Sequence, residues 1–206
     1  MMRLLLLGDA HLPRRAQKIP EPILSEIEKL TKDSLFDYIL FTGDLIESQD
    51  FIKYLKPKAN RQFLRVLGNM DYYGGNKDAP LMEDLVIEFP NNETLLVGLT
   101  HGAQIQDRGN HSQLEDLALE NSFNILISGH THKEEIFLTN KGILLLNPGS
   151  LTGAWSFLAS KIPSFIQLII QPENLLKVIL YQLKNKKISK SEHNFRFENG
   201  RLNSIP

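Results

Sequence analysis

The amino-acid sequence predicts an α/β fold that combines a parallel sheet with a series of hairpins. Over residues 4–67, short aliphatic runs alternate with segments of helical periodicity, as in sheets whose parallel strands are joined by helices. From residue 85 onward, pairs of apolar runs flank short turn sequences, which is the pattern of β-hairpins. With 206 residues and 42% hydrophobic content, the chain can bury one substantial core, and we expect one domain over residues 1–183.

Three strands and two helices are expected in the first part of the chain. Continuous aliphatic runs at 4–7, 38–41 and 63–67 predict strands that are buried on both faces. Apolar residues recur at three- and four-residue steps between positions 23 and 30, which predicts an amphipathic helix. A shorter helix is expected over 51–55, ending at Pro57. This order of elements favours a parallel sheet.

The rest of the chain predicts three hairpins, one helix and a tail. The expected hairpins are 85–89 with 94–99, 136–138 with 143–146, and 165–170 with 175–183. Ser112 and Glu115 have the spacing of a capping box that would open a helix over 114–119. Residues 184–206 are rich in lysine and lack periodicity, so we expect a surface extension or frayed tail there.

Composition excludes several classes of protein. The formal net charge is −1, which gives no overall attraction to nucleic acids or anionic membranes. The absence of cysteine excludes disulfides, thiolate zinc sites and cysteine nucleophiles. No run approaches the ~20 apolar residues of a transmembrane helix, and the run at 4–7 is too short for a signal peptide. We therefore expect a cytoplasmic protein, peripheral to membranes only through partners.

Polar side chains with the chemistry of metal ligands follow five of the expected strands. In open α/β sheets, ligands bind at the carboxyl ends of the strands, so these side chains should converge. Four of the six histidines lie in these segments. Taken singly, each Gly-Asp or Gly-Asn is more typical of a turn; jointly they predict a metal site. The segments are Gly8-Asp9-Ala10-His11, Gly43-Asp44, Gly68-Asn69-Met70-Asp71, Thr100-His101-Gly102 and Gly129-His130-Thr131-His132.

The number of candidate ligands favours two ions over one. A single ion takes about four to six ligands, several of them usually water. We expect Asp44 to bridge two ions, and Gly129 to supply the backbone bend that turns both neighbouring histidines toward one point. Nitrogen and oxygen donors without thiolate suit manganese, iron, cobalt or zinc. The candidate ligands are Asp9, His11, Asp44, Asn69, His101, His130 and His132.

Charge and metal chemistry together predict a phosphate-ester substrate. Two dications bring +4 and the two aspartates remove two charges, which leaves a site that attracts phosphate. Paired divalent ions can activate a water molecule and stabilise the oxygens of an in-line displacement. The expected reaction is hydrolysis of a phosphoester by a metal-activated water.

In combination, these motifs resemble the calcineurin-like metallophosphoesterases over nearly the whole chain. The resemblance is strongest to small single-domain forms, namely prokaryotic phosphodiesterases and the small subunit of the retromer coat. Segments 125–133, 147–154, 163–165 and 181–183 look especially like the retromer subunit. The resemblance implies a four-layer α/β/β/α sandwich. It also implies one ion held by Asp9, His11, Asp44 and His132, and another held by Asp44, Asn69, His101 and His130.

One departure from the family pattern concerns proton donation. Larger members have a histidine after the asparagine as proton donor to the leaving group, but this chain has Met70. General acid catalysis is typically worth 10²–10⁴-fold, so we expect hydrolysis to be slow unless the leaving group is good. Asp71 or a metal-bound water could substitute, and Asp71 could instead be a group that orients a histidine. The expected catalytic residues are therefore Asp44, Asn69, His101 and Asp71.

Other residues give weaker predictions. Arg14, with its neighbour Arg15, could contact the substrate phosphate or form a charged loop face. Tyr72 and Tyr73 could stack on a base or an aromatic leaving group, and Glu47 could brace the site or be a solvated helix residue.

A scaffold function is the alternative to catalysis. In that case the chain would bind a long helical-repeat partner of a retromer-like trafficking complex, with Ile105, Leu151 or Leu183 in the interface. The protein would then be weakly catalytic or non-catalytic, and the metal would have a structural role.

Overall fold

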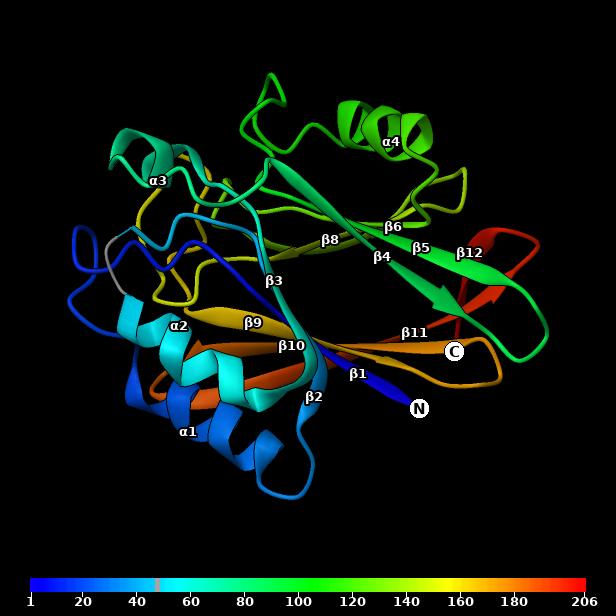
Figure 1. Cartoon of the computed structure of the whole chain (residues 1–206), viewed down its shortest axis with the longest axis horizontal. Helices are drawn as coiled ribbons and strands as arrows, with labels where there is room; N and C mark the ends of the chain where they lie inside the picture. The colour runs from blue at the N-terminus through cyan, green and yellow to red at the C-terminus, as the bar shows by residue number, and fades with distance from the viewer. Residues whose placement is uncertain (47–48) are drawn as a thin grey trace.

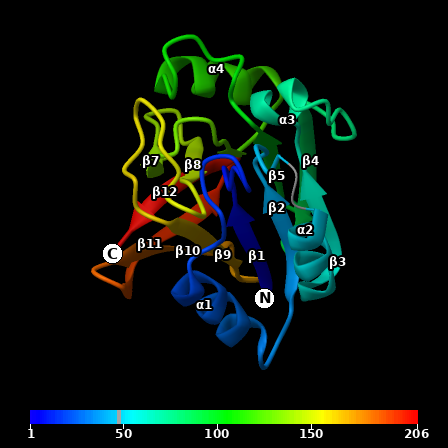
Figure 2. The same ribbon diagram turned by 90° about the vertical axis from the view of Figure 1, so that its left-hand side faces the viewer.

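Two β-sheets pack face to face in the computed structural model, with helices on their outer faces (Figure 1). The structure describes residues 1–46 and 49–206, so Glu47 lies outside the described residues. The seven-stranded sheet has the order β12-β11-β10-β9-β1-β2-β3, and the five-stranded sheet has the order β4-β5-β6-β8-β7. Seen from the side, α1 and α4 lie on opposite faces of the sheet pair (Figure 2). The predicted four-layer α/β/β/α sandwich is confirmed.

The first three strands form the parallel part of the larger sheet, as the sequence predicts. Leu4 and Leu6 point into the core between the sheets, whereas Leu5 and Leu7 pack against the helical layer. Burial on both faces explains why the strand is aliphatic throughout. The elements are β1 (Met2–Leu7), α1 (Glu21–Thr31), β2 (Phe36–Phe41), α2 (Gln49–Leu55), the 3₁₀ turn η1 (Lys56–Lys58) and β3 (Ala59–Arg65).

The smaller sheet contains two of the predicted hairpins, with α4 packed on its outer face. The N-terminus of α4 differs from the expected capping box. The Asn110 side chain caps the helix by accepting a hydrogen bond from the Gln113 N–H at 3.1 Å, so the helix begins at His111. The elements are β4 (Met82–Glu88), β5 (Thr94–Thr100), α4 (His111–Glu120), β6 (Ile125–Ile127), β7 (Glu134–Leu138) and β8 (Leu144–Pro148).

The C-terminal segment differs from the tail expected over 184–206. It pairs as two further strands on the edge of the larger sheet, after the predicted hairpin of β9 and β10. Phe195, Phe197 and Leu202 enter the core between the sheets. The rest of this segment is mostly exposed, which explains its polar sequence. The strands are β9 (Ser164–Ile170), β10 (Leu175–Lys184), β11 (Lys187–Glu198) and β12 (Arg201–Ile205).

The structure also corrects the apolar residues expected in a partner interface. Ile105 and Leu151 are buried, and Leu183 is partly buried against the core on the helical side. None of the three therefore offers a free apolar surface. None of the described helices is long and apolar enough to span a bilayer.

Candidate metal centre

The predicted ligand residues meet where strands of both sheets end. Asp9 and His11 follow β1, Asp44 follows β2, and Asn69 opens α3 (Asn69–Tyr73) after β3. His101 follows β5, and His130 and His132 follow β6. The short helix α3 is not anticipated by the sequence. The ligands thus come from loops of both sheets, and the packing of one sheet on the other brings them together.

Four of these side chains form what we call the first ligand group: Asp9, His11, Asp44 and His132. All four are buried, and one ligand atom from each lies within 4.8 Å of the others. His132 Nε2 lies 3.0 Å from His11 Nε2 and 3.3 Å from Asp9 Oδ1. Two ligands on one tetrahedral ion, each about 2.1 Å from it, lie about 3.4 Å apart. The observed spacing suits ligands that share one ion.

The second ligand group contains Asp44, Asn69, His101 and His130. His101 Nε2 lies 3.0 Å from Asn69 Oδ1 and 3.2 Å from His130 Nδ1. The same nitrogen lies 3.5 Å from Asp44 Oδ2. His101 Nε2 therefore lies at the spacing of shared ligands from one atom of each of the other three residues.

Asp44 connects the two groups through one oxygen. Its Oδ2 lies 3.4 Å from His11 Nε2 and 3.5 Å from His101 Nε2. The other oxygen, Oδ1, accepts a hydrogen bond from the Met70 N–H at 2.8 Å. Oδ2 therefore faces residues of both ligand groups, while Oδ1 is held by the backbone.

Left-handed backbone conformations aim the ligands. Asp9 and His11 have φ of 47° and 49°, and His130 and His132 have φ of 69° and 58°. In each pair, two residues separated by one position adopt the same uncommon conformation, which turns both side chains inward. Asp44 has φ of 57°. Each such residue costs about 1–3 kcal/mol, and such strain clusters at functional sites.

The role expected for Gly129 is wrong, because the positive φ angles belong to the histidines on its C-terminal side and Gly129 is not among the positive-φ glycines. Gly129 is needed for close approach instead. A Cβ there would lie 2.5 Å from Thr42 Oγ1 and 2.6 Å from Asp9 Oδ2. Glycine therefore allows the loop after β6 to approach the Asp9 carboxylate closely. The carboxylate oxygens accept a hydrogen bond from the His130 N–H.

Backbone carbonyls fix the protonation pattern of two ligands. His101 Nδ1 donates to the Thr42 carbonyl at 2.7 Å, and His132 Nδ1 donates to the Ala154 carbonyl at 2.9 Å. In the neutral ring each Nε2 then carries a lone pair that points into the site. His11 Nδ1 is buried without a hydrogen-bond partner among the described residues. Facing lone pairs and buried carboxylates fit divalent transition-metal ions.

Electrostatics keep two further histidines in the form that binds metal. Burial lowers the pKa of His11 to about 3, although Asp9 opposes the shift. Burial and repulsion from His101 lower the pKa of His130 to about 4. Both rings are therefore neutral at pH 7, and neutral imidazole is the ligand form.

The carboxylates shift in opposite directions. Burial raises the pKa of Asp44 to about 6. Burial also opposes ionisation of Asp9, but attraction to His132 holds the pKa of Asp9 below its usual value. Burial likewise opposes the charged form of His132, and Asp9 outweighs it, so the pKa of His132 is raised. Without metal, the negative charge of Asp9 and the positive charge of His132 offset each other within the first ligand group.

Asp71 is placed as a support for the Asp44 loop, not as an orienter of a histidine. Its Oδ2 accepts hydrogen bonds from the Asp44 N–H at 2.8 Å and the Gly68 N–H at 3.2 Å, and its Oδ1 accepts from the Ile46 N–H at 2.7 Å. Backbone donors thus occupy both oxygens of this buried carboxylate. The structure therefore gives no support to Asp71 as a proton donor.

The predicted substrate-contacting residues are exposed at the surface. Arg14 is exposed in the loop after β1, with its guanidinium beside Gly74 at the end of α3. Arg15 Nη1 donates to the Trp155 carbonyl at 2.8 Å. Tyr72 is half exposed on α3, and Lys77 Nζ lies 4.5 Å from the centre of its ring.

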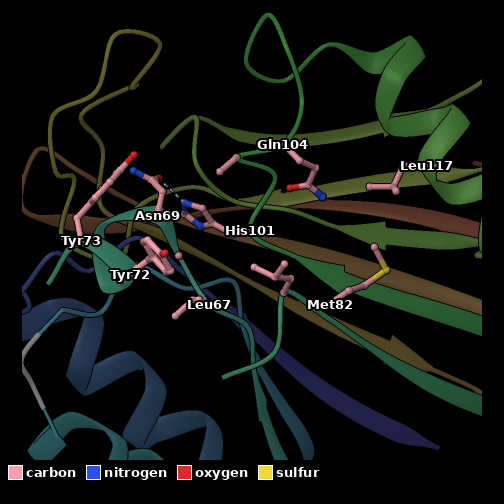
Figure 3. Close-up of a pocket in the computed structure, with 11 residues that line it drawn as sticks. Leu67, Asn69, Tyr72, Tyr73, Met82, His101, Gln104 and Leu117 are labelled. Atoms are coloured by element: carbon pink, nitrogen blue, oxygen red, sulfur yellow. Dashed lines mark hydrogen bonds between the residues drawn. The ribbon is translucent and has the colours of Figure 1, made fainter. Parts of the chain in front are cut away.

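A cavity of about 430 Å³, which we call the side cavity, opens beside the second ligand group (Figure 3). Asn69 and His101 belong both to its lining and to the ligand group. Figure 3 shows them on one side of the cavity and Met82 and Leu117 on the other. Sequence reasoning singled out Asn69, His101, Tyr72 and Tyr73 as functional candidates but did not anticipate the cavity or its other lining residues. Its apolar lining comes from segments far apart in the chain: Leu67, Tyr72, Tyr73, Leu81, Met82 and Leu117.

Residues 2–167 match the model of the calcineurin-like phosphoesterase superfamily domain. The chain belongs to this family. It is 35% identical, over 152 residues, to a "Probable metallophosphoesterase" of Methanothermobacter thermautotrophicus, covering 71% of this chain and 76% of that protein.

Two solved structures extend the comparison. A single mutant of Vps29 from Entamoeba histolytica superposes with a TM-score of 0.81 and 29% identity, over 95% of this chain and 100% of that chain. Wild-type Vps29 of the same organism, solved as a complex with Zn²⁺, gives a TM-score of 0.79 and 30% identity, over 94% and 99%. The family and the buried Asp and His cluster together indicate binding of divalent metal.

Proposed function

We propose that this family member is a phosphodiesterase that binds two divalent transition-metal ions. The observation that carries the proposal is the position of Asp44 Oδ2, which lies 3.4 Å from His11 Nε2 and 3.5 Å from His101 Nε2. An oxygen between two sets of inward-facing donors is placed to bridge two ions. The first ligand group would hold one ion and the second group the other; the donor set suits manganese, zinc, iron or cobalt.

The ligand residues would position and charge the site for a phosphoester. When bound, the ions lower the pKa of a water molecule and neutralise charge that develops on the phosphate. The chain itself supplies few negative charges against that cationic centre, because only Asp9 and Asp44 among the seven ligands ionise to carboxylates. The left-handed loops and the carbonyl partners hold the donors in place before substrate arrives.

Met70 restricts which esters can react quickly. Its thioether cannot transfer a proton, and the Asp71 carboxylate is occupied by backbone N–H groups. The leaving group would therefore depart without an acid from either position. We expect efficient hydrolysis of aryl diesters, whose leaving oxygen is weakly basic, and slow hydrolysis of alkyl diesters.

An assay with bis(p-nitrophenyl) phosphate and added manganese tests this function. Wild type should hydrolyse the diester, and Asp44→Asn should lower kcat/KM by about 10²–10³-fold, the usual effect of removing a group that organises transition-state charge. Asp50→Asn is the matched control, because the Asp50 side chain is 94% exposed. Equal rates for wild type and Asp44→Asn, both loaded with metal, would refute the proposal.

A second function, as a scaffold subunit of a retromer-like complex, is favoured by the likeness to Vps29 and by one surface. Trp155, Phe157 and Leu158 are exposed in the loop that follows β8. Ala154 in the same loop contacts the ligand His132. An apolar loop beside the metal centre could bind a helical-repeat partner, and such a partner would bring the chain to a membrane peripherally.

A pull-down from the native source, with wild type and Phe157→Ser as baits, tests the scaffold function. Phe157 is 79% exposed, so its replacement should leave the fold intact. Recovery of a large helical-repeat protein by wild type, and its loss with Phe157→Ser, is the expected result. If neither bait recovers such a protein, the scaffold function fails while the enzymatic one stands.

A further inference from the structure

The side cavity is continuous with the second ligand group. His101 Nε2 lies next to Asn69 Oδ1 and Asp44 Oδ2. Asn69 and His101 also form one wall of the cavity. A phosphate held by the ligand groups would therefore have the cavity directly beside it. About 430 Å³ is within the range of small-molecule sites. The cavity is thus placed to receive a group attached to the phosphate.

Most of the lining is aliphatic or aromatic. Leucine, methionine and tyrosine side chains make up most of it, and Tyr72 and Tyr73 meet edge to face with ring centres 6.0 Å apart. No aspartate, glutamate, lysine or arginine lines it within the part of the chain that the structure describes. A cavity of this kind favours an apolar occupant, because burial of apolar surface is the main favourable contact it can offer.

Polar recognition inside the cavity is limited. The Gln104 amide donates to Thr100 Oγ1 at 3.0 Å, and Asn69 Oδ1 faces His101. Together with the Tyr72 and Tyr73 hydroxyls, these amides and the His101 ring are the polar side-chain groups of the lining, and they are few beside the several donors and acceptors of a nucleobase or a sugar, whose burial without partners is unfavourable. The absence of a cationic lining residue among the described ones also disfavours a second phosphate.

We propose that the side cavity is the specificity pocket of the metal centre, and that the substrates are phosphoesters carrying an apolar alkyl or aryl group. This rests on the proposed function, since the phosphate must sit at the ligand groups. Asn69 and His101 would contact the phosphate end, and Leu81, Met82 and Leu117 would contact the apolar end. Nucleotides and sugar phosphates would be poorer ligands.

Binding of n-alkylphosphonates to the manganese-loaded protein tests the pocket without relying on turnover. The C–P bond resists hydrolysis, and the phosphonate head stays constant from methyl to hexyl. By calorimetry, each added CH₂ should tighten Kd by about three- to fourfold until the cavity is filled. Hexylphosphonate should bind more tightly than adenosine 5′-monophosphate. A Kd that is flat across the series, or tighter binding of the nucleotide, would overturn the proposal.

Two pocket variants and a control locate the effect. Ala103→Trp should fill the cavity and flatten the dependence of Kd on chain length. Leu81→Ser should weaken hexylphosphonate by about tenfold. Val86→Ser is the control, because Val86 is 52% exposed on β4 and does not line the cavity, whereas Leu81 is 73% exposed and lines it. If Kd depended equally on chain length in wild type and in all three variants, the alkyl group would bind outside the side cavity and the proposal would fail.

A metal-free measurement separates failure of the pocket from failure of the enzyme. Saturation-transfer NMR on the metal-free chain should show contact between 3-phenylpropanol and the protein, and Ala103→Trp should remove it. If this contact is present but no diester is hydrolysed, the proposed function fails and the cavity remains an apolar site. If diesters are hydrolysed but the contact and the chain-length dependence are absent, the pocket proposal fails alone.

Discussion

The two ligand groups share Asp44 but differ in their surroundings. Burial does not separate them, since His132 and His101 are each 2% exposed, but no residue of the first group lines the side cavity, so we call it the enclosed group. The second opens at Asn69 and His101 onto the side cavity. Enclosure favours tight retention of an ion and constant geometry, whereas an open wall admits a ligand. The comparison suggests that the first group anchors metal and the second receives substrate.

Replacement of one histidine in each group should have the largest effect. His132→Ala and His101→Ala should each lower kcat/KM for an aryl diester by about 10²–10³-fold, because each removes a ligand. Metal analysis by mass spectrometry should show a fall from two bound ions to about one. If His132→Ala retained two ions with full activity, the enclosed group would have no role in anchoring metal.

Chelation should reveal how much metal stabilises the fold. Free metal at 100 times its Kd stabilises the folded state by about 2.7 kcal/mol per site. We expect the midpoint of thermal unfolding to fall when metal is removed, and to fall less in His132→Ala, which begins with a damaged enclosed group. An unchanged midpoint on chelation of wild type would exclude a structural contribution from metal.

Asp71→Asn should disturb the loop that carries the shared ligand. The amide offers one acceptor where the carboxylate accepts three backbone N–H groups, and its own N–H₂ would face donors. The expected loss of unfolding free energy is about 2 kcal/mol, since buried donors left unpaired cost roughly 1–3 kcal/mol each. Chemical denaturation measures it, with Asp78→Asn as an exposed control. An unchanged stability would mean that the loop is held by other contacts.

Met70→His should give the smallest change in kcat/KM, and this change should be an increase. A histidine there would supply the proton donor that this chain lacks, so hydrolysis of alkyl diesters should rise by about tenfold while aryl diesters gain little. The ratio of the two kcat/KM values is the readout, with Met70→Leu as control. An equal gain in kcat/KM on both substrates would point to a change in packing at the second ligand group, not to proton transfer.

Sequence reasoning anticipated most of the fold and the convergence of the candidate ligands for a physical reason. Strands buried on both faces are aliphatic, and polar side chains placed directly after such strands stand out, so both leave local marks such as Leu4 to Leu7 followed by Gly8-Asp9. The last two strands, β11 and β12, left no such mark. Phe195, Phe197 and Leu202 are their buried apolar residues and Ile188 is partly buried, whereas most of the other side chains are exposed.

The sequence by itself determined which residues can bind metal, because ligand chemistry belongs to the side chain. Tertiary structure decided how they are used. At Gly129 the loop after β6 lies close to Thr42 and Asp9, which belong to loops of the other sheet. The position of Asp44 Oδ2 between His11 and His101 likewise joins loops of both sheets. The side cavity depends on the approach of α3, the start of β4 and α4, which are distant in the chain. Such contacts between remote segments are set by packing and have no local pattern in sequence.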